Sequence, residues 1–592
     1  MEVIKLQSIK IIEPTFDDKL YNEVEAAILG TNKFNLEQKN FIHFLNPAVI
    51  QAGPGSGKTT VLSAKIALLL KKIESDGNLD GICVITHTNA AVEEISKNLS
   101  KLGIKKITHP HFIGTINEFF NKYGMFPYLQ NILKNNKQWE IIDEDIFAQK
   151  LKDSLSSKPE HSWMNLKDRE EVALNLCSKL LRSHLSFNSQ NILEAHTYES
   201  GAFENYRKNY VELRQQYWEE GIYHVNDTFC LSQKYFNNQA IVERIQRRFK
   251  YIFMDEYQDV SPLAFDLLKM LFQNQLNIMQ IIGDQNQHIS YSNPEVNLAG
   301  FEKYYLNQIN RFGDLIVNPL NKMFSSNRLH ALNQNKSKKP ILMIYQDATK
   351  ISNEFFKIIT SYNIFQLQDG QYILVFVRKH ISDLSIKLLK TKKNSKESKF
   401  RRAKNLIYNR LSTKVQKRGP IIKMELQKNH PDLELELNRA LLDFLKPSNK
   451  TNDLLTQTLN HILSTYNITE PITQTDRLID NLSTLKSESI NSDDTKTTPI
   501  INSKTVHDLK GQTLTSSLVY LQKSSINEKA FLSNYCSKIN LEETELINKR
   551  VLYVAMSRAT TLLIIALHRE SYSELSEAEL KNLKNDFDVI HI

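Results

Sequence analysis

Glycine and cysteine are scarce in this sequence, and no long apolar run interrupts it. Only 17 of the 592 residues are glycine, so glycines clustered at one place call for a local reason. The cysteines Cys83, Cys177, Cys230 and Cys536 lie far apart without a C-x-x-C pair, which argues against a zinc site or a disulfide framework. No apolar run reaches the roughly 18 residues of a membrane span, and the N-terminal segment lacks a signal-peptide core. We therefore expect a soluble, cytoplasmic protein.

The charge balance is mildly basic. Lysine and arginine number 75 against 66 acidic residues, a net charge of +9, which is a weak hint of a polyanionic partner and says nothing about fold. A hydrophobic content of 41% and a charged content of 24% are ordinary for a globular protein. At about 150 residues per domain, the length predicts roughly four domains.

Short apolar runs along the chain predict buried strands of parallel sheets: AVIQA, GICVIT, YIFMDE, MQIIGD, YILVFV, SSLVYL and LLIIAL. Between about 120 and 230 the sequence turns helical, charged and aromatic. A second insertion, from about 385 to 500, begins densely basic and ends polar and glycine-free. With no internal repeat, the simplest organisation is α/β, with two cores that are each interrupted by a mainly helical insertion.

The densest glycine cluster lies in AVIQAGPGSGKTTV, between a predicted strand and a predicted helix. Such a loop presents backbone N–H groups to an anion, and the helix dipole adds to them. Lys58 supplies a point charge and Thr59 a hydroxyl for Mg²⁺. The strand-loop-helix setting favours a nucleoside triphosphate site over a fortuitous turn. The residues expected to contact the nucleotide are Ala52, Gly53, Pro54, Gly55, Ser56, Gly57, Lys58, Thr59 and Thr60.

Two carboxylates follow another apolar strand, in FKYIFMDEYQDVSP. Asp255 is placed to hold Mg²⁺, and Glu256 to accept the proton of an attacking water. An acidic surface turn is the alternative, and the phosphate loop makes it the weaker one.

Together, AGPGSGKT and DEYQD resemble superfamily 1 helicases of the UvrD/Rep/PcrA type, and other motifs follow in the family's order between residues 35 and 560. These are NLEQKNFI, ITHTNAAVEEI, FIGTINEFF, IIGDQNQHI, LNQINRF, TVHDLKGQTL and VLYVAMSRAT. The resemblance implies two tandem RecA-like P-loop NTPase cores, 1A and 2A, with helical insertions 1B and a reduced 2B. It also implies ATP and Mg²⁺ as cofactors and single-stranded or tailed DNA as a partner.

The resemblance also assigns roles at the nucleotide. It implies that Gln38 reads the adenine edge and that Gln287 senses the γ-phosphate. Arg311 would reach the γ-phosphate, and Arg558 would act as an arginine finger across the cleft. With Glu256 as the base, these last three side chains complete the expected catalytic set.

DNA contacts follow from the same resemblance. They fall on His87, Thr88 and Asn89, on Thr115, on Tyr291 as a candidate for base stacking, and on His507. For His507 we favour a hydrogen bond to DNA or to another motif over plain packing. His87 stands where the family has phenylalanine, and Gln512 and Thr513 stand where it has leucine and glutamate. These departures weaken the expectation of robust unwinding more than that of ATP hydrolysis.

The expected boundaries place an N-terminal extension first and then alternate cores with insertions. Core 1A takes 35–118 and 232–320, insertion 1B takes 119–231, core 2A takes 321–385 and 500–592, the 2B-like insertion takes 386–499, and the extension takes 1–34. About a dozen lysines and arginines lie between Lys390 and Arg418, and both a solvated face and duplex binding stay open for them. Only about thirty residues follow the last motif, too few for a nuclease domain.

The expected function is an ATP-dependent helicase or translocase that moves 3′→5′ on DNA, in repair or in anti-phage defence. FIGTINEFF and the short second insertion resemble the helicase-like subunit of Gabija-type systems, which implies a partner nuclease subunit. The alternative is therefore an ATPase that senses DNA ends and activates that nuclease with little unwinding. A scaffold with a dead nucleotide site is disfavoured, because the catalytic residue types are all present.

Overall fold

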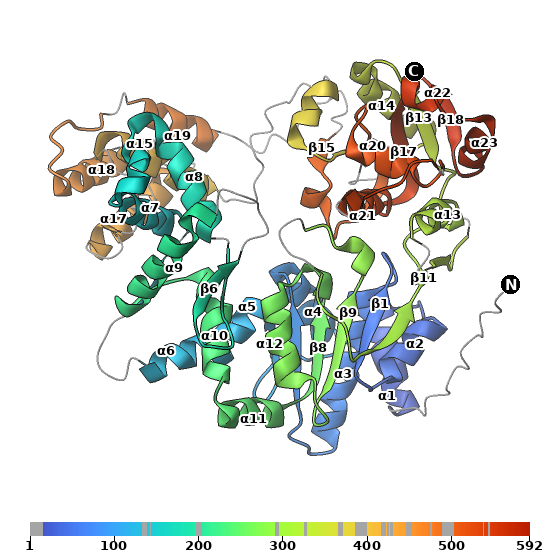
Figure 1. Ribbon diagram of the computed structural model, residues 1–592, viewed down its shortest axis with the longest axis horizontal. Helices are drawn as coiled ribbons and strands as arrows, with labels where there is room; N and C mark the ends of the chain where they lie inside the picture. The colour runs from blue at the N-terminus through green and yellow to red at the C-terminus, as the bar shows by residue number, and fades with distance from the viewer. Residues whose placement is uncertain are drawn as a thin grey trace.

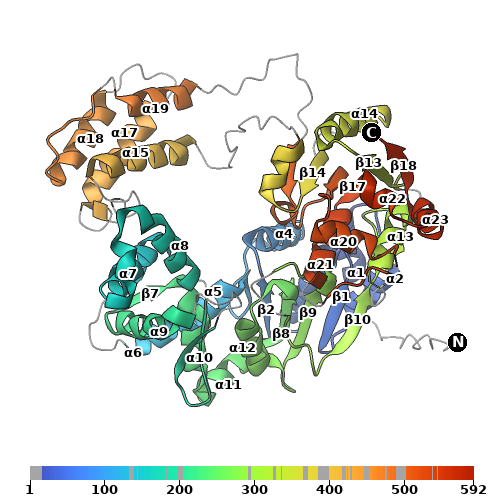
Figure 2. The same ribbon diagram turned by 45° about the horizontal axis from the view of Figure 1, so that its top comes forward.

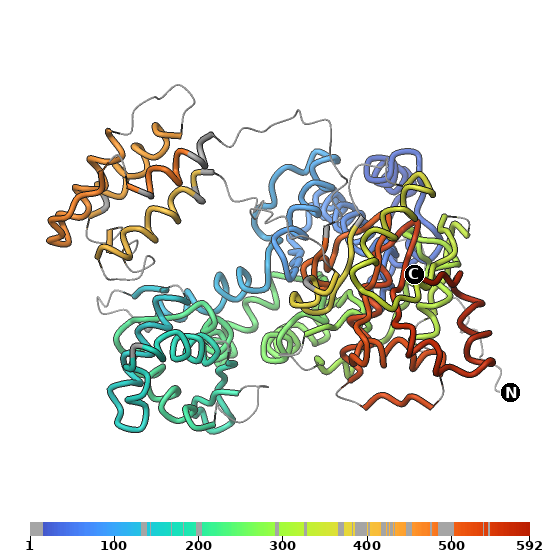
Figure 3. The backbone as a smooth tube through the Cα atoms, turned by 90° about the horizontal axis from the view of Figure 1, so that it is seen from above, coloured from blue at the N-terminus to red at the C-terminus, as the bar shows by residue number. Residues whose placement is uncertain are grey.

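The computed structural model describes most of the chain from residue 16 to residue 592. The segments outside the described residues are 1–15, 133–138, 143, 182, 197–203, 291–294, 325–327, 335, 365–370, 385–398, 416–421, 423–424, 427–429, 446–452, 474–475, 488–501, 537 and 543–544. Two six-stranded sheets form the bulk of the molecule, and two helical insertions lie together on one side of them in all three views (Figures 1, 2 and 3). Among the described residues, no helix is both long and apolar enough to cross a bilayer.

The first sheet is parallel throughout, in the order β10-β1-β9-β8-β2-β3. Its strands are β1 (Ala48–Ala52), β2 (Gly81–Thr86), β3 (Phe112–Thr115), β8 (Phe249–Asp255), β9 (Ile278–Gly283) and β10 (Glu302–Leu306). Because strand side chains alternate between faces, Ala48 and Ile50 join one apolar cluster and Val49 joins the other. One face is covered by α1 (Asp18–Leu29), α2 (Leu36–His43), α3 (Lys58–Ser75) and α4 (Asn89–Ser100), and the other by α11 (Gln239–Arg248) and α12 (Pro262–Phe272).

The second sheet is also parallel, in the order β15-β14-β16-β17-β13-β18. Its strands are β13 (Ile341–Tyr345), β14 (Gln371–Val375), β15 (Asn502–Thr505), β16 (Leu514–Tyr520), β17 (Ala559–His568) and β18 (Asp588–His591). Its helices are α13 (Asp314–Met323), α14 (Ile351–Ser361), α20 (Ile526–Leu532), α21 (Leu546–Met556), α22 (Arg569–Ser573) and α23 (Glu577–Asp586). Each apolar run named above lies in one of the two parallel sheets, so the predicted mixed α/β class is confirmed.

The two insertions have apolar cores of their own. The first contains α5 (Ile116–Phe120), a π-helical turn (Asn121–Met125), α6 (Phe126–Ile132), α7 (Glu144–Ser156), α8 (Glu170–Leu181), α9 (Glu204–Glu219) and α10 (Thr228–Phe236). Two small sheets accompany these helices, β4 (Glu140–Ile142) with β7 (Ile222–His224) and β5 (His184–Phe187) with β6 (Leu193–His196). The second contains α15 (Lys399–Val415), α17 (Pro431–Phe444), α18 (Asp453–Thr465) and α19 (Arg477–Ser487).

Two packing details bear on the predicted domain limits, which themselves stay predictions. Helix α1, within the segment expected to be an extension, buries Tyr21, Val24 and Ile28 in the core of the first sheet. Helix α13, expected in core 1A up to residue 320, packs its apolar side into the core of the second sheet. In each case an amphipathic helix lies against the sheet that covers its apolar face.

Candidate active site

The carboxyl ends of β1, β8 and β9 meet at one edge of the first sheet, because parallel strands all end at the same edge. This edge faces the second sheet across a cavity of about 510 Å³. Both sheets contribute to the wall of the cavity, which is lined by Pro54, Gly55, Gly57, Lys58, Thr59, Thr60, Glu94, Glu256, Gln287, Asn310, Arg311, Lys336, Gly511, Thr513, Arg558 and Thr560. Most of the predicted nucleotide residues therefore lie together, with Arg311 and Arg558 in the same wall.

The geometry of the phosphate loop explains its glycines. Gly57 has a φ of +82° and directly precedes the first residue of α3, and Gly55 has a φ of +83°. A Cβ on Gly55 would lie 2.3 Å from the Cβ of Arg311. Glycine at position 55 therefore permits both the left-handed backbone and the close approach of Arg311.

Lys58 and Glu256 form an ion pair in the cavity, with the ammonium nitrogen 3.4 Å from each of the two carboxylate oxygens. Burial lowers the pKa of Lys58, but the carboxylates of Glu256, Asp284 and Asp255 outweigh it and raise the pKa above its ordinary value. Glu256 has a φ of +54°, an uncommon conformation for a residue with a side chain. Such strain is typical of functional positions.

Asp255 is 1% exposed at the end of β8. Its Oδ1 accepts a hydrogen bond from the Glu256 amide at 3.0 Å, while its Oδ2 is buried without a hydrogen-bond partner among the described residues. Burial, together with the charge of Glu256, raises the pKa of Asp255 to about 7. A buried carboxylate oxygen that lacks a donor is suited to a hard cation. This side chain thus fits the expected Mg²⁺, as does the hydroxyl of Thr59, which lines the cavity.

Two arginines line the cavity, Arg311 beside Gly55 and Arg558 directly before β17 of the second sheet. Arg558, 1% exposed, donates to the Val554 carbonyl at 2.9 Å and to Gln287 Oε1 at 3.3 Å. Burial and the neighbouring charge of Arg311 lower the pKa of Arg558 to about 9. Arg311 itself donates to the Ser557 carbonyl at 3.4 Å. Both guanidinium groups are thus held by backbone oxygens at the cavity wall.

A second cavity, of about 480 Å³, which we call the groove pocket, lies beside the first sheet and brings together four of the predicted DNA residues: His87, Thr88, Asn89 and Thr115. Thr88 and Thr115 cap the N-termini of α4 and α5. Phe229 of α10 also lines the pocket and packs edge-on against Phe120. An aromatic ring beside polar side chains is suited to stacking a nucleic-acid base.

The groove pocket and the nucleotide cavity are linked across the two sheets. Asp259, which lines the groove pocket, accepts an ion-paired hydrogen bond from Lys510 of the second sheet. The Nε2 atom of His507 lies 3.3 Å from the carbonyl oxygen of Ile289, and the expected role of His507 toward DNA stays a prediction. Tyr291, the predicted stacking residue, lies outside the described residues.

Sequence reasoning missed three residues that matter here. Asp284 accepts from Gln287 Nε2 at 2.9 Å, and its own amide donates to Gln258 Oε1 at 3.2 Å. Gln258 also donates to Glu256 at 2.5 Å. Both residues lie inside the quoted motifs DEYQD and GDQNQ, so the sequence could have nominated them. Phe229 carried no signal, because only the folding of the first insertion brings it to the pocket.

Gln38, which is expected to read adenine, bonds to two backbone groups, and its role at the base stays a prediction. Its Nε2 donates to the Ser56 carbonyl at 2.7 Å, and its Oε1 accepts from the Asn35 amide at 3.0 Å in the N-terminal capping box of α2. Both ends of the carboxamide are therefore engaged by backbone, and the side chain is 5% exposed.

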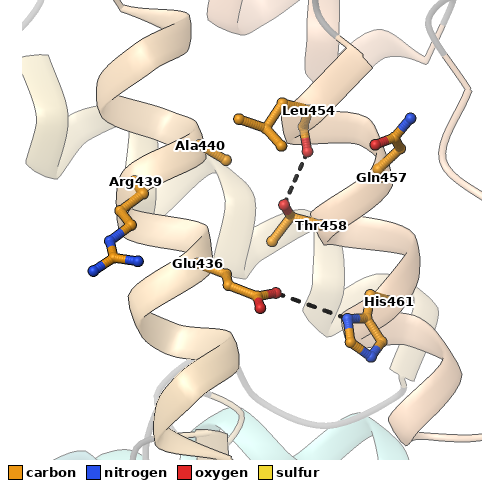
Figure 4. A pocket seen from close by; sticks show the side chains of 7 residues that line it. All are labelled: Glu436, Arg439, Ala440, Leu454, Gln457, Thr458 and His461. Atoms are coloured by element: carbon orange, nitrogen blue, oxygen red, sulfur yellow. Dashed lines mark hydrogen bonds and ion pairs between the residues drawn. The ribbon is translucent and has the colours of Figure 1, made fainter.

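The basic helix α15 directs several of its cations inward. Lys404 pairs with Glu434, Arg410 with Asp476 and Lys414 with Glu470, all within the second insertion. The side chains of Arg401 and Arg402 lie outside the described residues, so duplex binding stays a prediction for them. A cavity lies between α17 and α18 in the same insertion. In it, the Glu436 carboxylate points toward His461, with 3.8 Å between Oε2 and Nδ1 (Figure 4).

Known proteins resemble part of the chain. Residues 34–293 match the family described as the UvrD/REP helicase N-terminal domain. An "ATP-dependent DNA helicase Rep" from Buchnera aphidicola is 29% identical over 43% of this chain and 37% of its own length. A "Probable DNA helicase II homolog" from Mycoplasma capricolum is 27% identical over 57% of this chain and 41% of its own. An "ATP-dependent DNA helicase PcrA" from Staphylococcus aureus is 27% identical over 50% and 40%. The matched part thus spans less than half the length of these curated relatives.

Proposed function

The chain is of the UvrD/Rep/PcrA helicase type, and on this premise we propose that it hydrolyses ATP between its two sheets to move along single-stranded DNA. One observation carries the proposal. Lys58, Asp255 and Glu256 line or adjoin the same cavity as Arg311 and as Arg558, which directly precedes β17 of the second sheet. Phosphoryl transfer depends on positioning and charge neutralisation, and this cavity concentrates both.

Each residue has a step in the proposed reaction. The amides of residues 53–57 and the Lys58 ammonium bind the phosphates, and Arg311 and Arg558 neutralise the charge that develops on the γ-phosphate. Glu256 accepts the proton of the attacking water. Phosphates that draw Lys58 away from Glu256 would free this carboxylate to act as the base. Thr59 and Asp255 would hold Mg²⁺, which would offset the negative charge of the phosphates.

Coupling to DNA follows from contacts that join the two sides. Arg558 reaches Gln287, and Lys510 reaches Asp259 in the groove pocket, so closure of the nucleotide cavity would move the pocket that we assign to DNA. We assign the two sheets to RecA-like cores 1A and 2A and the insertions to 1B and 2B. Translocation 3′→5′ is part of the proposal and rests on the family resemblance alone.

The first test is ATP hydrolysis with and without single-stranded DNA, using Lys58→Ala as the blank. We expect DNA to stimulate hydrolysis, because the two cavities are linked. Glu256→Gln should abolish turnover while ATP still binds, since the amide keeps the side chain's shape but cannot accept the water's proton. Retained turnover in Glu256→Gln would remove the assigned base, and hydrolysis indifferent to DNA would remove the coupling.

Unwinding separates this proposal from its alternative, an ATPase that senses DNA ends and activates a partner nuclease. Duplexes with a 3′ or a 5′ single-stranded tail should be opened from the 3′ tail if the chain is a motor of the expected direction. ATP hydrolysis without strand separation, together with a nuclease that co-purifies, would favour the alternative and a defence role.

A further inference from the structure

We propose that Lys336 binds the phosphates that ATP and ADP share, and so holds the nucleotide before and after hydrolysis. This inference rests on the proposed function and names a further binding residue for its substrate. Four cations line the nucleotide cavity, Lys58, Arg311, Lys336 and Arg558, against only two carboxylates among the described residues of the lining. Such a surplus of positive charge suits a polyanionic ligand.

The segment that carries Lys336 is fixed to the second sheet. The hydroxyl of Ser337 donates to the Thr560 carbonyl, in β17, at 2.7 Å. The backbone amide of Lys338 donates to the carbonyl of the next residue of β17, also at 2.7 Å. Because β17 begins directly after Arg558, the same strand places the backbone of Lys336 and the arginine at the cavity.

The ammonium group of Lys336 lies beside the phosphate loop. Its Nζ donates to the Asn310 carbonyl at 2.5 Å, and the Asn310 amide donates to the Gly55 carbonyl at 3.1 Å. Among the residues that the structure describes, no carboxylate forms an ion pair with this ammonium. A charged phosphate oxygen is a stronger acceptor for an ammonium than a neutral carbonyl. A bound polyphosphate would therefore draw Lys336 from Asn310.

The neighbours of Arg311 assign Lys336 to the α- and β-phosphates. Burial and then the charge of Arg311 lower the pKa of Lys336, and the same two causes lower the pKa of Arg558. Arg311 therefore adjoins both cations. Arg558, which the proposed reaction places at the γ-phosphate, donates to Gln287, whereas Lys336 donates to Asn310 beside the loop. Phosphates bound between Arg311 and Lys336 would also offset the repulsion between these two cations.

The experiment measures the Kd of ADP that carries a fluorescent label on its ribose, and kcat and KM for ATP with saturating single-stranded DNA. Lys336→Ala should raise the Kd for ADP and the KM for ATP by a common factor of roughly tenfold to a hundredfold, the range for one lost hydrogen bond to a charged group. The value of kcat should change by less than about twofold, because binding that is lost equally from ground state and transition state raises KM alone.

Two further variants control for charge. Lys336→Arg, which keeps the cation, should restore most of the affinity for ADP. Lys338→Ala removes the same charge from the same segment, outside the described lining, and should leave both nucleotides bound as in wild type. Unchanged ADP binding in Lys336→Ala, or an equal loss in Lys338→Ala, would overturn the inference. A fall in kcat with ADP binding intact would move Lys336 to the γ-phosphate and overturn it as well.

Failure of the proposed function can be distinguished from failure of this inference. If the wild type hydrolyses no ATP, the proposed hydrolysis fails. The Kd values of wild type and Lys336→Ala for labelled ADP then still decide the role of Lys336, with Lys58→Ala as the blank. If the wild type binds no ADP, the inference is overturned whatever the rate of hydrolysis.

Discussion

Replacing Asp255 by asparagine should stabilise the nucleotide-free protein at alkaline pH and change little at acidic pH. Asp255 is fully buried, and burial and Glu256 raise its pKa from the ordinary 3.8 to about 7. At a pH between these two pKa values, Asp255 is deprotonated in the unfolded chain and protonated in the folded chain. Stability therefore falls as pH rises through this window, and the whole penalty is present above pH 7.

The size of the effect follows from the shift. About three pKa units at 1.36 kcal/mol each amount to about 4 kcal/mol lost from the folded state at pH 8. Asparagine has no charge to bury, so Asp255→Asn avoids this penalty. For a cooperative unit of 150 to 250 residues, about 4 kcal/mol corresponds to a melting temperature raised by about 10 °C.

The assay is thermal unfolding of wild type and Asp255→Asn at pH 5, 6, 7 and 8, without nucleotide or divalent metal. The difference between the two melting temperatures should grow steadily with pH. Asp266→Asn, which removes an exposed carboxylate from the nearby helix α12, controls for net charge and should give a constant difference. A gap between wild type and Asp255→Asn that is the same at pH 5 and pH 8 would refute the account of the buried carboxylate.

Three further predictions test other parts of the molecule. Arg558→Ala should lower kcat by about 10³-fold with little change in ATP affinity, because the guanidinium acts on developing charge, and a comparable loss of binding would contradict that role. Phe229→Ala should weaken single-stranded DNA binding by about tenfold in fluorescence anisotropy, and Phe229→Trp should restore it. Unchanged binding in Phe229→Ala would show that no base stacks on this ring. Lys65→Met should cost about 3 kcal/mol in chemical unfolding, because the fully buried amino group donates to the Phe41 carbonyl at 2.8 Å and to Gln280 Oε1 at 2.7 Å and the substitution would leave these acceptors unpaired. A neutral effect would show that packing alone holds α2.

Local chemistry made the strands of the sheets and the conformation of the glycine-rich loop predictable. A run such as AVIQA is buried on both faces, so its apolar residues alone indicate a strand of a covered parallel sheet. The loop after it needs glycines for left-handed backbone and a lysine for phosphate charge, and both needs are local. Asp255 and Glu256 were recognisable for the same reason, since their position at a strand end is written in the order of residues.

Tertiary structure alone decided which residues, distant in the sequence, line the nucleotide cavity and the groove pocket. Arg311 lies beside Gly55 of the phosphate loop, whereas Arg558, 247 positions later, lines the same cavity only because the two sheets face each other. Phe229 reaches the groove pocket because the first insertion folds back onto the sheet, and Lys510 reaches Asp259 for a similar reason. The motif of Gln38 indicates a base reader, and only the fold shows that its carboxamide also bonds to the Asn35 amide and the Ser56 carbonyl. The sequence determines which donors, acceptors and charges each segment carries, and tertiary packing determines which groups they contact.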